Sequence, residues 1–139
     1  MIKLRAHHLI CIPRFKYGGS YNKNIDNRFY QIQDKVKKNP NTTLKIIAKP
    51  DYICLSCPHF KNKKCMKRVG IHNRLIKFDK QILKKLRIKT NSTIKAKDAF
   101  LLSIEKIKNK QIKKMCKGCE FQDYCLKHGI NKSFIKKVK

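Results

Sequence analysis

Two cysteine-rich loops are the feature that most constrains how this 139-residue chain can fold. Each loop has two cysteines separated by two residues and a third cysteine further on: Cys54, Cys57 and Cys65 in the first loop, and Cys116, Cys119 and Cys125 in the second. A two-residue spacing lets both sulfurs turn toward one metal without straining the backbone. Two such pairs, each with a third cysteine, predict thiolate ligation of a metal. Buried structural cysteines or a redox-active pair are the alternative interpretation.

The spacing leaves the metal open between zinc and iron. A tetrahedral zinc site built from the two CxxC pairs would leave Cys65 and Cys125 unused. Two zinc sites of three cysteines and one histidine are also compatible, with His59 near the first loop and His128 three residues after Cys125. Iron–sulfur clusters accept less regular spacing, and Pro58 directly after a cysteine is similar to the Cys-Pro step of ferredoxin loops. We therefore expect iron–sulfur ligation of the [4Fe–4S] type, with zinc as the alternative.

The seventh cysteine, Cys11, lies outside both loops and follows Arg5, His7 and His8. We predict that Cys11 lies near the metal of the first loop, where three cysteines leave one coordination position to fill. The competing interpretation treats it as a small buried hydrophobe. Of the two adjacent histidines, we expect at most one to face the site, and Arg5 to pair with a carboxylate or a substrate anion. His72 is interpreted only as a residue at the start of a helix.

The hydrophobic pattern predicts an α+β fold that is mostly helical. We expect a short extended or helical segment leading into Cys11 and a short strand over 44–48. Three main helices are expected over 22–38, 72–86 and 97–114, the last being the longest. The last two should form a hairpin joined near Asn91 that brings both cysteine loops to one end of a single domain, 1–139. Residues 132–139 are predicted to be a frayed basic tail.

Composition excludes several classes of protein. No run of about 18 apolar residues exists, so we expect no membrane span. The N-terminal segment lacks the apolar stretch of a secretion signal, and seven cysteines is an odd number, which disfavours a secreted disulfide scaffold. We therefore expect a reduced, cytoplasmic protein.

The net charge of +28 comes from 36 basic and 8 acidic residues. Thirty of the basic residues are lysines spread along the whole chain, which indicates a solvated surface or a composition bias. A nucleic-acid-binding face would more often concentrate arginine and aromatic residues. An acidic redox partner is therefore compatible with the charge, and nucleic acid is the less favoured partner.

Three segments together resemble a small prokaryotic family catalogued as domain of unknown function 1284. They are Leu4-Arg5-Ala6-His7-His8-Leu9-x-Cys11, Pro50-Asp51-x-Ile53-Cys54-x-x-Cys57-Pro58-His59, and Cys116-x-x-Cys119-Glu120-Phe121-x(3)-Cys125. The family pattern has tryptophan where this chain has Phe121, which keeps an aromatic ring and loses the indole N–H. The resemblance implies no activity. It implies that the N-terminal segment belongs with the cysteine loops.

These observations together predict an iron–sulfur protein that acts in electron transfer or as a cluster-bearing component of an enzyme. Seven cysteines cannot supply eight ligands to two cubane clusters, so one iron would have another ligand or an open position. Arg5, His7 and His8 are the candidate groups for anion binding and proton transfer there. A structural zinc protein that binds nucleic acid, and a sulfur-relay protein using Cys11, are the alternatives.

Overall fold

The computed structural model describes residues 1–16, 23–66, 70–115, 126 and 129–139. Its helices and strands are, in chain order, β1 (Ile2–Arg5), α1 (His8–Cys11), η1 (Ile12–Arg14), α2 (Lys23–Lys38), β2 (Thr43–Ile47), η2 (Cys54–Ser56), β3 (Phe60–Lys61), β4 (Lys64–Cys65), α3 (Ile71–Leu86), β5 (Thr93–Lys95), α4 (Ala96–Lys106), α5 (Asn109–Met115) and α7 (Lys132–Val138). The protein is therefore α+β, with helices predominating and the strands short. No helix within these ranges has both the length and the apolar character needed to cross a membrane.

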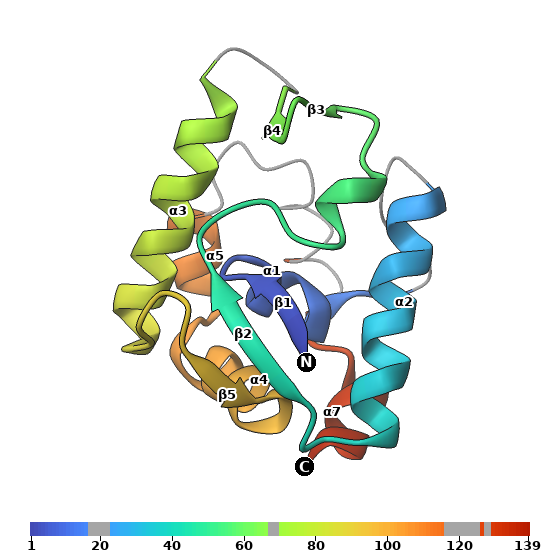
Figure 1. Ribbon diagram of the computed structural model, residues 1–139. Helices are drawn as coiled ribbons and strands as arrows, with labels where there is room; N and C mark the ends of the chain where they lie inside the picture. The colour runs from blue at the N-terminus through green and yellow to red at the C-terminus, as the bar shows by residue number, and fades with distance from the viewer. Residues whose placement is uncertain (17–22, 67–69, 116–125, 127–128) are drawn as a thin grey trace.

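A three-stranded sheet in the order β1-β2-β5 organises the molecule. β1 pairs with β2 in parallel, with Ile2 opposite Leu44 and Arg5 opposite Ile47, and β5 pairs with β2 antiparallel. Figure 1 shows α2 and α3 on either side of β1 and β2, with the β3–β4 hairpin beyond the carboxyl ends of these two strands. Both parallel strands therefore end on the side of the molecule where the first cysteine loop lies.

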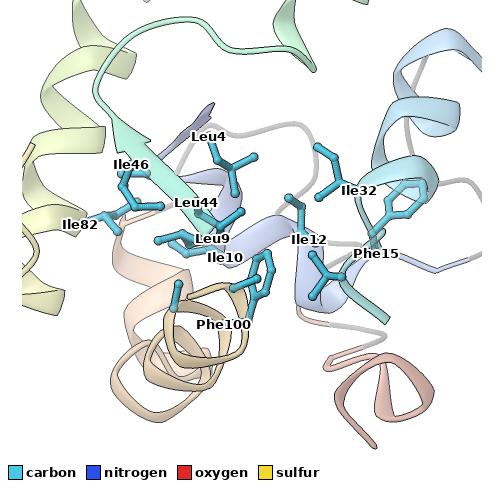
Figure 2. Close-up of a cluster of buried hydrophobic side chains, with 14 of the residues drawn as sticks. Leu4, Leu9, Ile10, Ile12, Phe15, Ile32, Leu44, Ile46, Ile82 and Phe100 are labelled. Carbon is cyan, nitrogen blue, oxygen red and sulfur yellow. The ribbon is translucent and has the colours of Figure 1, made fainter. Parts of the chain in front are cut away.

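The hydrophobic core lies where the sheet meets α1, α2, α4 and α7. Figure 2 shows side chains of β1 and β2, including Leu4 and Leu44, close to those of α1 and to Phe100 of α4. Leu4, Leu44 and Phe100 have no solvent-exposed surface. On α2 the buried residues recur every three or four positions, which places them on one face of the helix: Ile25, Phe29, Ile32 and Val36.

Several predicted elements are confirmed. The helices expected over 22–38 and 72–86 are α2 and α3, and the strand expected over 44–48 is β2. The segment leading into Cys11 is both extended and helical, because β1 is followed by α1.

The prediction of one long helix over 97–114 is wrong. The chain forms α4 and then α5, and between them Ile107 has an extended backbone, with φ −111° and ψ 93°. The side chain of Arg14 donates a hydrogen bond to the Ile107 carbonyl at 2.8 Å, and Lys108 N–H donates to Gln111 Oε1 at 2.9 Å. These bonds satisfy backbone groups that a continuous helix would have paired internally, so the interruption costs little.

The predicted helical hairpin and frayed tail also need correction. Between α3 and α4 the chain does not simply turn near Asn91, because it first adds β5 to the sheet beside β2. Residues 132–138 form α7, in which Phe134 and Val138 are fully buried. The segment is not frayed, because the apolar residues among its lysines complete the core.

Candidate metal centre

The candidate site begins where the chain leaves β1 and turns into α1. Arg5 is the last residue of β1 and is 1% exposed, and His7 precedes the first turn of α1. A hydrogen bond from Leu9 N–H to the Ala6 carbonyl, 3.0 Å long, closes the turn. This sharp corner, at the carboxyl end of a buried strand, holds one guanidinium and two imidazoles within five residues.

Asp79 of α3 binds this corner from one side. Its Oδ2 accepts hydrogen bonds from Nε and Nη2 of Arg5, at 2.9 and 2.8 Å. Its Oδ1 accepts from the His7 backbone N–H at 2.9 Å and lies 2.8 Å from His7 Nδ1. Asp79 has no exposed surface, so this carboxylate and its two partners form a buried charged group.

Asp51 binds the same corner from the other side. Its Oδ2 accepts from the Arg5 backbone N–H at 2.9 Å and lies 2.6 Å from Nδ1 of His8. Its Oδ1 accepts from the backbone N–H groups of Ile53 and Cys54, at 3.0 and 3.2 Å. One carboxylate therefore connects the N-terminal corner to the start of the first cysteine loop.

The two imidazole rings lie together, and the expectation that at most one of them faces the metal stays a prediction. Their centroids are 4.5 Å apart in an edge-on arrangement, because the two residues lie at a corner and not inside a regular helix or strand. The His7 ring stacks on Phe78, and the edge of the His8 ring meets Phe29. Each Nδ1 faces a carboxylate, and no group within the described ranges hydrogen-bonds to either Nε2. A carboxylate at Nδ1 orients an imidazole so that Nε2 is available as a ligand or a proton acceptor.

The electrostatics of the corner follow from burial. Burial lowers the pKa of His7 to about 4, against the opposing effect of Asp79, so the ring is neutral at pH 7. Burial alone would raise the pKa of Asp51, but His8 and the backbone hydrogen bonds outweigh it and lower that pKa to about 2. Burial, reinforced by Asp51, raises the pKa of the Cys54 thiol to about 12. Without a bound cation, Cys54 is therefore a protonated thiol and a poor nucleophile.

The first cysteine loop places Cys54 and Cys57 at the two ends of η2 and Cys65 in β4. Cys54 and Cys57 are bridged by a hydrogen bond from Cys57 N–H to the Cys54 carbonyl, 3.0 Å long. The β3–β4 hairpin then returns the chain so that Cys65 lies opposite Phe60. Its two turn residues, Asn62 and Lys63, have positive φ angles of 51° and 61°, as a two-residue hairpin turn requires.

His72 connects this hairpin to α3, which is more than the sequence indicated. Its Nδ1 accepts a hydrogen bond from the Cys65 backbone N–H at 3.2 Å. Because α3 also carries Asp79, the helix holds both the N-terminal corner and the end of the cysteine loop.

Three potential metal ligands converge where the corner meets the loop. Ligand atoms of His8, Asp51 and Cys54 lie within 4.8 Å of one another. The Cys54 sulfur also accepts a hydrogen bond from Nη1 of Arg5 at 3.5 Å. A nitrogen, an oxygen and a sulfur donor in this arrangement are the ligand types that zinc and iron accept.

The other predicted ligands are distributed as follows. Cys11 is the last residue of α1, is partly buried and packs against the hydrophobic core. Cys57 and Cys65 are partly buried in the loop. That Cys11 lies near the metal of the first loop stays a prediction. The cysteines of the second loop and the histidine after it lie outside the described residues: Cys116, Cys119, Cys125 and His128.

Sequence reasoning missed the roles of Asp51 and Asp79. A signal for Asp79 was present, because it occupies the apolar stripe of its helix between Leu75 and Ile82 in a chain with only 8 acidic residues. An acidic residue in such a stripe indicates a buried ionic partner. For Asp51, the signal was its place within the segment that carries the family resemblance.

A family model described as protein of unknown function, DUF1284, matches residues 19–125. The chain belongs to this family. The part of the chain matched to DUF1284 contains Asp51, Cys54 and Asp79, whereas Arg5 and the two adjacent histidines precede it. No curated protein and no solved structure matches the chain.

Proposed function

We propose that the protein binds an iron–sulfur cluster of the [4Fe–4S] type at the first cysteine loop, as an electron-transfer protein or a cluster-bearing enzyme component. The observation that carries the proposal is the contact of Arg5, which is 1% exposed, with the Cys54 sulfur. Arginine donates to sulfur most favourably when the sulfur is a thiolate, and hydrogen bonds to ligand sulfurs tune a cluster's potential. Cys57 and Cys65 are the further ligands on the same loop.

The buried groups beside the loop hold Arg5 against its first cysteine. Asp51 and Asp79 are both buried: Asp79 pairs with the Arg5 guanidinium, and Asp51 accepts from the Arg5 backbone N–H. The guanidinium is therefore kept beside the Cys54 sulfur, where a positive charge favours the thiolate form that a metal requires.

The two histidines provide chemistry beside such a cluster. The orientation of each ring by a carboxylate leaves Nε2 of His7 and His8 to bind an iron without a cysteine ligand, or to move a proton at a substrate. Neutral His7 would act as the acceptor, since its low pKa keeps the Nε2 lone pair available. The Lys-rich surface suits an acidic redox partner.

A single metal ion, zinc or iron, held by His8, Asp51 and Cys54 is the second candidate. The 4.8 Å clustering of their ligand atoms favours it. Against it, both oxygens of Asp51 already accept two hydrogen bonds each, from Arg5 and His8 at Oδ2 and from the loop backbone at Oδ1. A metal bound to Asp51 would have to displace some of these bonds, whereas ligation through the cysteines would keep them.

Anaerobic purification followed by measurement of iron, acid-labile sulfide, zinc and visible absorption tests the proposal. We expect a brown protein containing iron and sulfide. Cys54→Ser, Cys57→Ser and Cys65→Ser should each lose cluster, because ligation free energy is also folding free energy. Met66→Ser, beside Cys65 and 55% exposed, is the control and should keep it.

A colourless protein with stoichiometric zinc and no sulfide would contradict the cluster and favour the single-ion site. The variant Asp51→Asn then separates the two candidates further. It should abolish binding of a single ion, and it should only weaken a cluster held by the cysteines.

A further inference from the structure

A cavity of about 590 Å³ opens between β1, α2 and the segment 49–55. Its volume falls within the range of about 300–1,000 Å³ that small-molecule sites occupy. Among the described loop cysteines, Cys54, Cys57 and Cys65 do not line it, so the cavity is distinct from the proposed cluster site, although it shares Asp51 with the polar groups beside that site.

Exposed apolar side chains distinguish this cavity from the rest of the described surface. Within the described ranges, four large hydrophobic residues are exposed: Met1 at 71%, Tyr52 at 42%, Leu55 at 59% and Met66 at 55%. Three of the four line the cavity, together with Ile2 and Pro50. Apolar groups gathered around one concavity indicate a binding site, whereas scattered ones need no explanation.

The outer wall of the cavity is held in place before any ligand binds. The hydroxyl of Tyr52 donates to Gln31 Oε1 of α2 at 2.8 Å. The guanidinium of Arg28 lies 4.1 Å from the centroid of the Tyr52 ring and donates to the Tyr52 carbonyl. A wall fixed in this way lowers the entropy lost when a ligand is bound.

The charge of the lining sets the sign of the ligand. Lys3, Lys35 and Lys49 line the cavity, and Asp51 is the one acidic residue among the described residues that line it. The carboxylate of Asp51 is already engaged by Arg5, His8 and the loop backbone. Lysine is common all over this chain, so the apolar residues mark the cavity as a site, and the lysines make its potential positive.

We propose that this cavity binds a small amphiphilic anion, with an apolar chain or ring and one carboxylate group. The apolar part would lie against Ile2, Pro50 and Leu55, and the carboxylate would lie among the three lysines. The inference does not depend on the proposed iron–sulfur function.

Titration of the isotope-labelled full chain with decanoate, below its micellar concentration, tests the proposal by amide chemical shifts. We expect saturable shifts concentrated at residues 1–3, 31–35 and 49–55. Decyltrimethylammonium, with the same chain length and the opposite charge, should bind at least about tenfold more weakly.

Two pairs of variants locate the site. Leu55→Asn should weaken decanoate about tenfold, whereas Met66→Asn, equally exposed but outside the cavity, should not change it. Lys35→Gln should weaken decanoate about threefold, and Lys38→Gln on the same helix should leave it unchanged. These substitutions are at exposed positions and should leave the protein folded.

Equal binding of the cationic probe would overturn the preference for an anion. Shifts spread over the whole chain, or unchanged affinity in Leu55→Asn, would overturn the site itself. Because Leu55 lies between Cys54 and Cys57, the metal content of Leu55→Asn is measured beside its affinity, and unchanged metal content assigns a lost affinity to the cavity.

Discussion

Leu4 and Arg5 are neighbours in β1 and are equally buried, at 0% and 1% exposure, but they enter opposite environments. Successive side chains of a strand point to opposite faces of the sheet. Leu4 joins the apolar core with Leu44 and Phe100. Arg5 joins the polar corner, which we define as Arg5, His7, His8, Asp51 and Asp79.

The two regions meet the same requirement of burial by different means. Apolar side chains of similar volume can replace one another in a core at modest cost. In the polar corner both carboxylates, the Arg5 guanidinium and Nδ1 of each histidine have specific partners, and removal of one partner leaves a buried charge in a low-dielectric environment. Such an arrangement is weak evidence for stability, and its presence beside three cysteines is better explained by function.

The largest effect should follow from breaking the ion pair in the polar corner. Asp79→Ala leaves Arg5 buried without its carboxylate, and we expect a loss of about 3–5 kcal/mol in the free energy of unfolding. The double variant Arg5→Met/Asp79→Leu should recover most of that stability, because it replaces the pair by apolar groups. Chemical denaturation of the metal-free proteins measures both values.

Leu4→Ala is the matched control from the core. It should cost about 2–5 kcal/mol through lost burial and a cavity, without changing the metal content of the folded protein. The stabilised double variant should lose metal, since Arg5 no longer contacts Cys54. Full metal content in the double variant would show that the polar corner serves stability alone.

A smaller effect should appear as a dependence of stability on pH. Because burial lowers the pKa of His7 from 6.5 to about 4, the unfolded chain takes up a proton before the folded protein does as the pH falls. The contribution of His7 is therefore complete above pH 6.5 and is lost progressively toward pH 4. It amounts to at most about 3.5 kcal/mol, at about 1.4 kcal/mol per pH unit.

The comparison of metal-free wild type with His7→Gln isolates this term, because other titrating groups contribute to both proteins. Glutamine can still donate a hydrogen bond to Asp79, but it does not titrate. The difference in unfolding free energy between the two proteins should change between pH 6.5 and 4. A constant difference would mean that His7 binds its proton equally well in both states.

The sequence predicted those parts of the molecule that depend on local pattern. α2 and α3 follow from apolar residues at helical spacing, whereas metal binding by the three cysteines of the first loop stays a prediction from their spacing. The break at Ile107 was not predictable, because it depends on Arg14, 93 residues away. The sequence indicated only part of the polar corner. Arg5 and the histidines were candidate site residues, but their partners Asp51 and Asp79 lie 43 to 74 residues away, so no local pattern showed the pairing.

The smallest effect concerns the apolar region at α7, the segment for which the sequence pattern predicts a frayed tail. Asn131 Oδ1 accepts from Phe134 N–H at 3.1 Å and caps the helix, while Nδ2 donates to the Phe15 carbonyl at 2.9 Å. Asn131→Ala should therefore cost about 1 kcal/mol. Asn131→Asp keeps the capping acceptor and loses the donor to Phe15, so it should cost less.

Both Asn131 variants should keep the full metal content, because α7 packs against α2 and the hydrophobic core. Denaturation midpoints and metal analysis on the same samples check both statements. Loss of metal in a variant destabilised by only about 1 kcal/mol would show that the core and the polar corner are energetically coupled. Leu4 and Arg5 would then differ in the chemistry of their side chains but would not belong to independent regions.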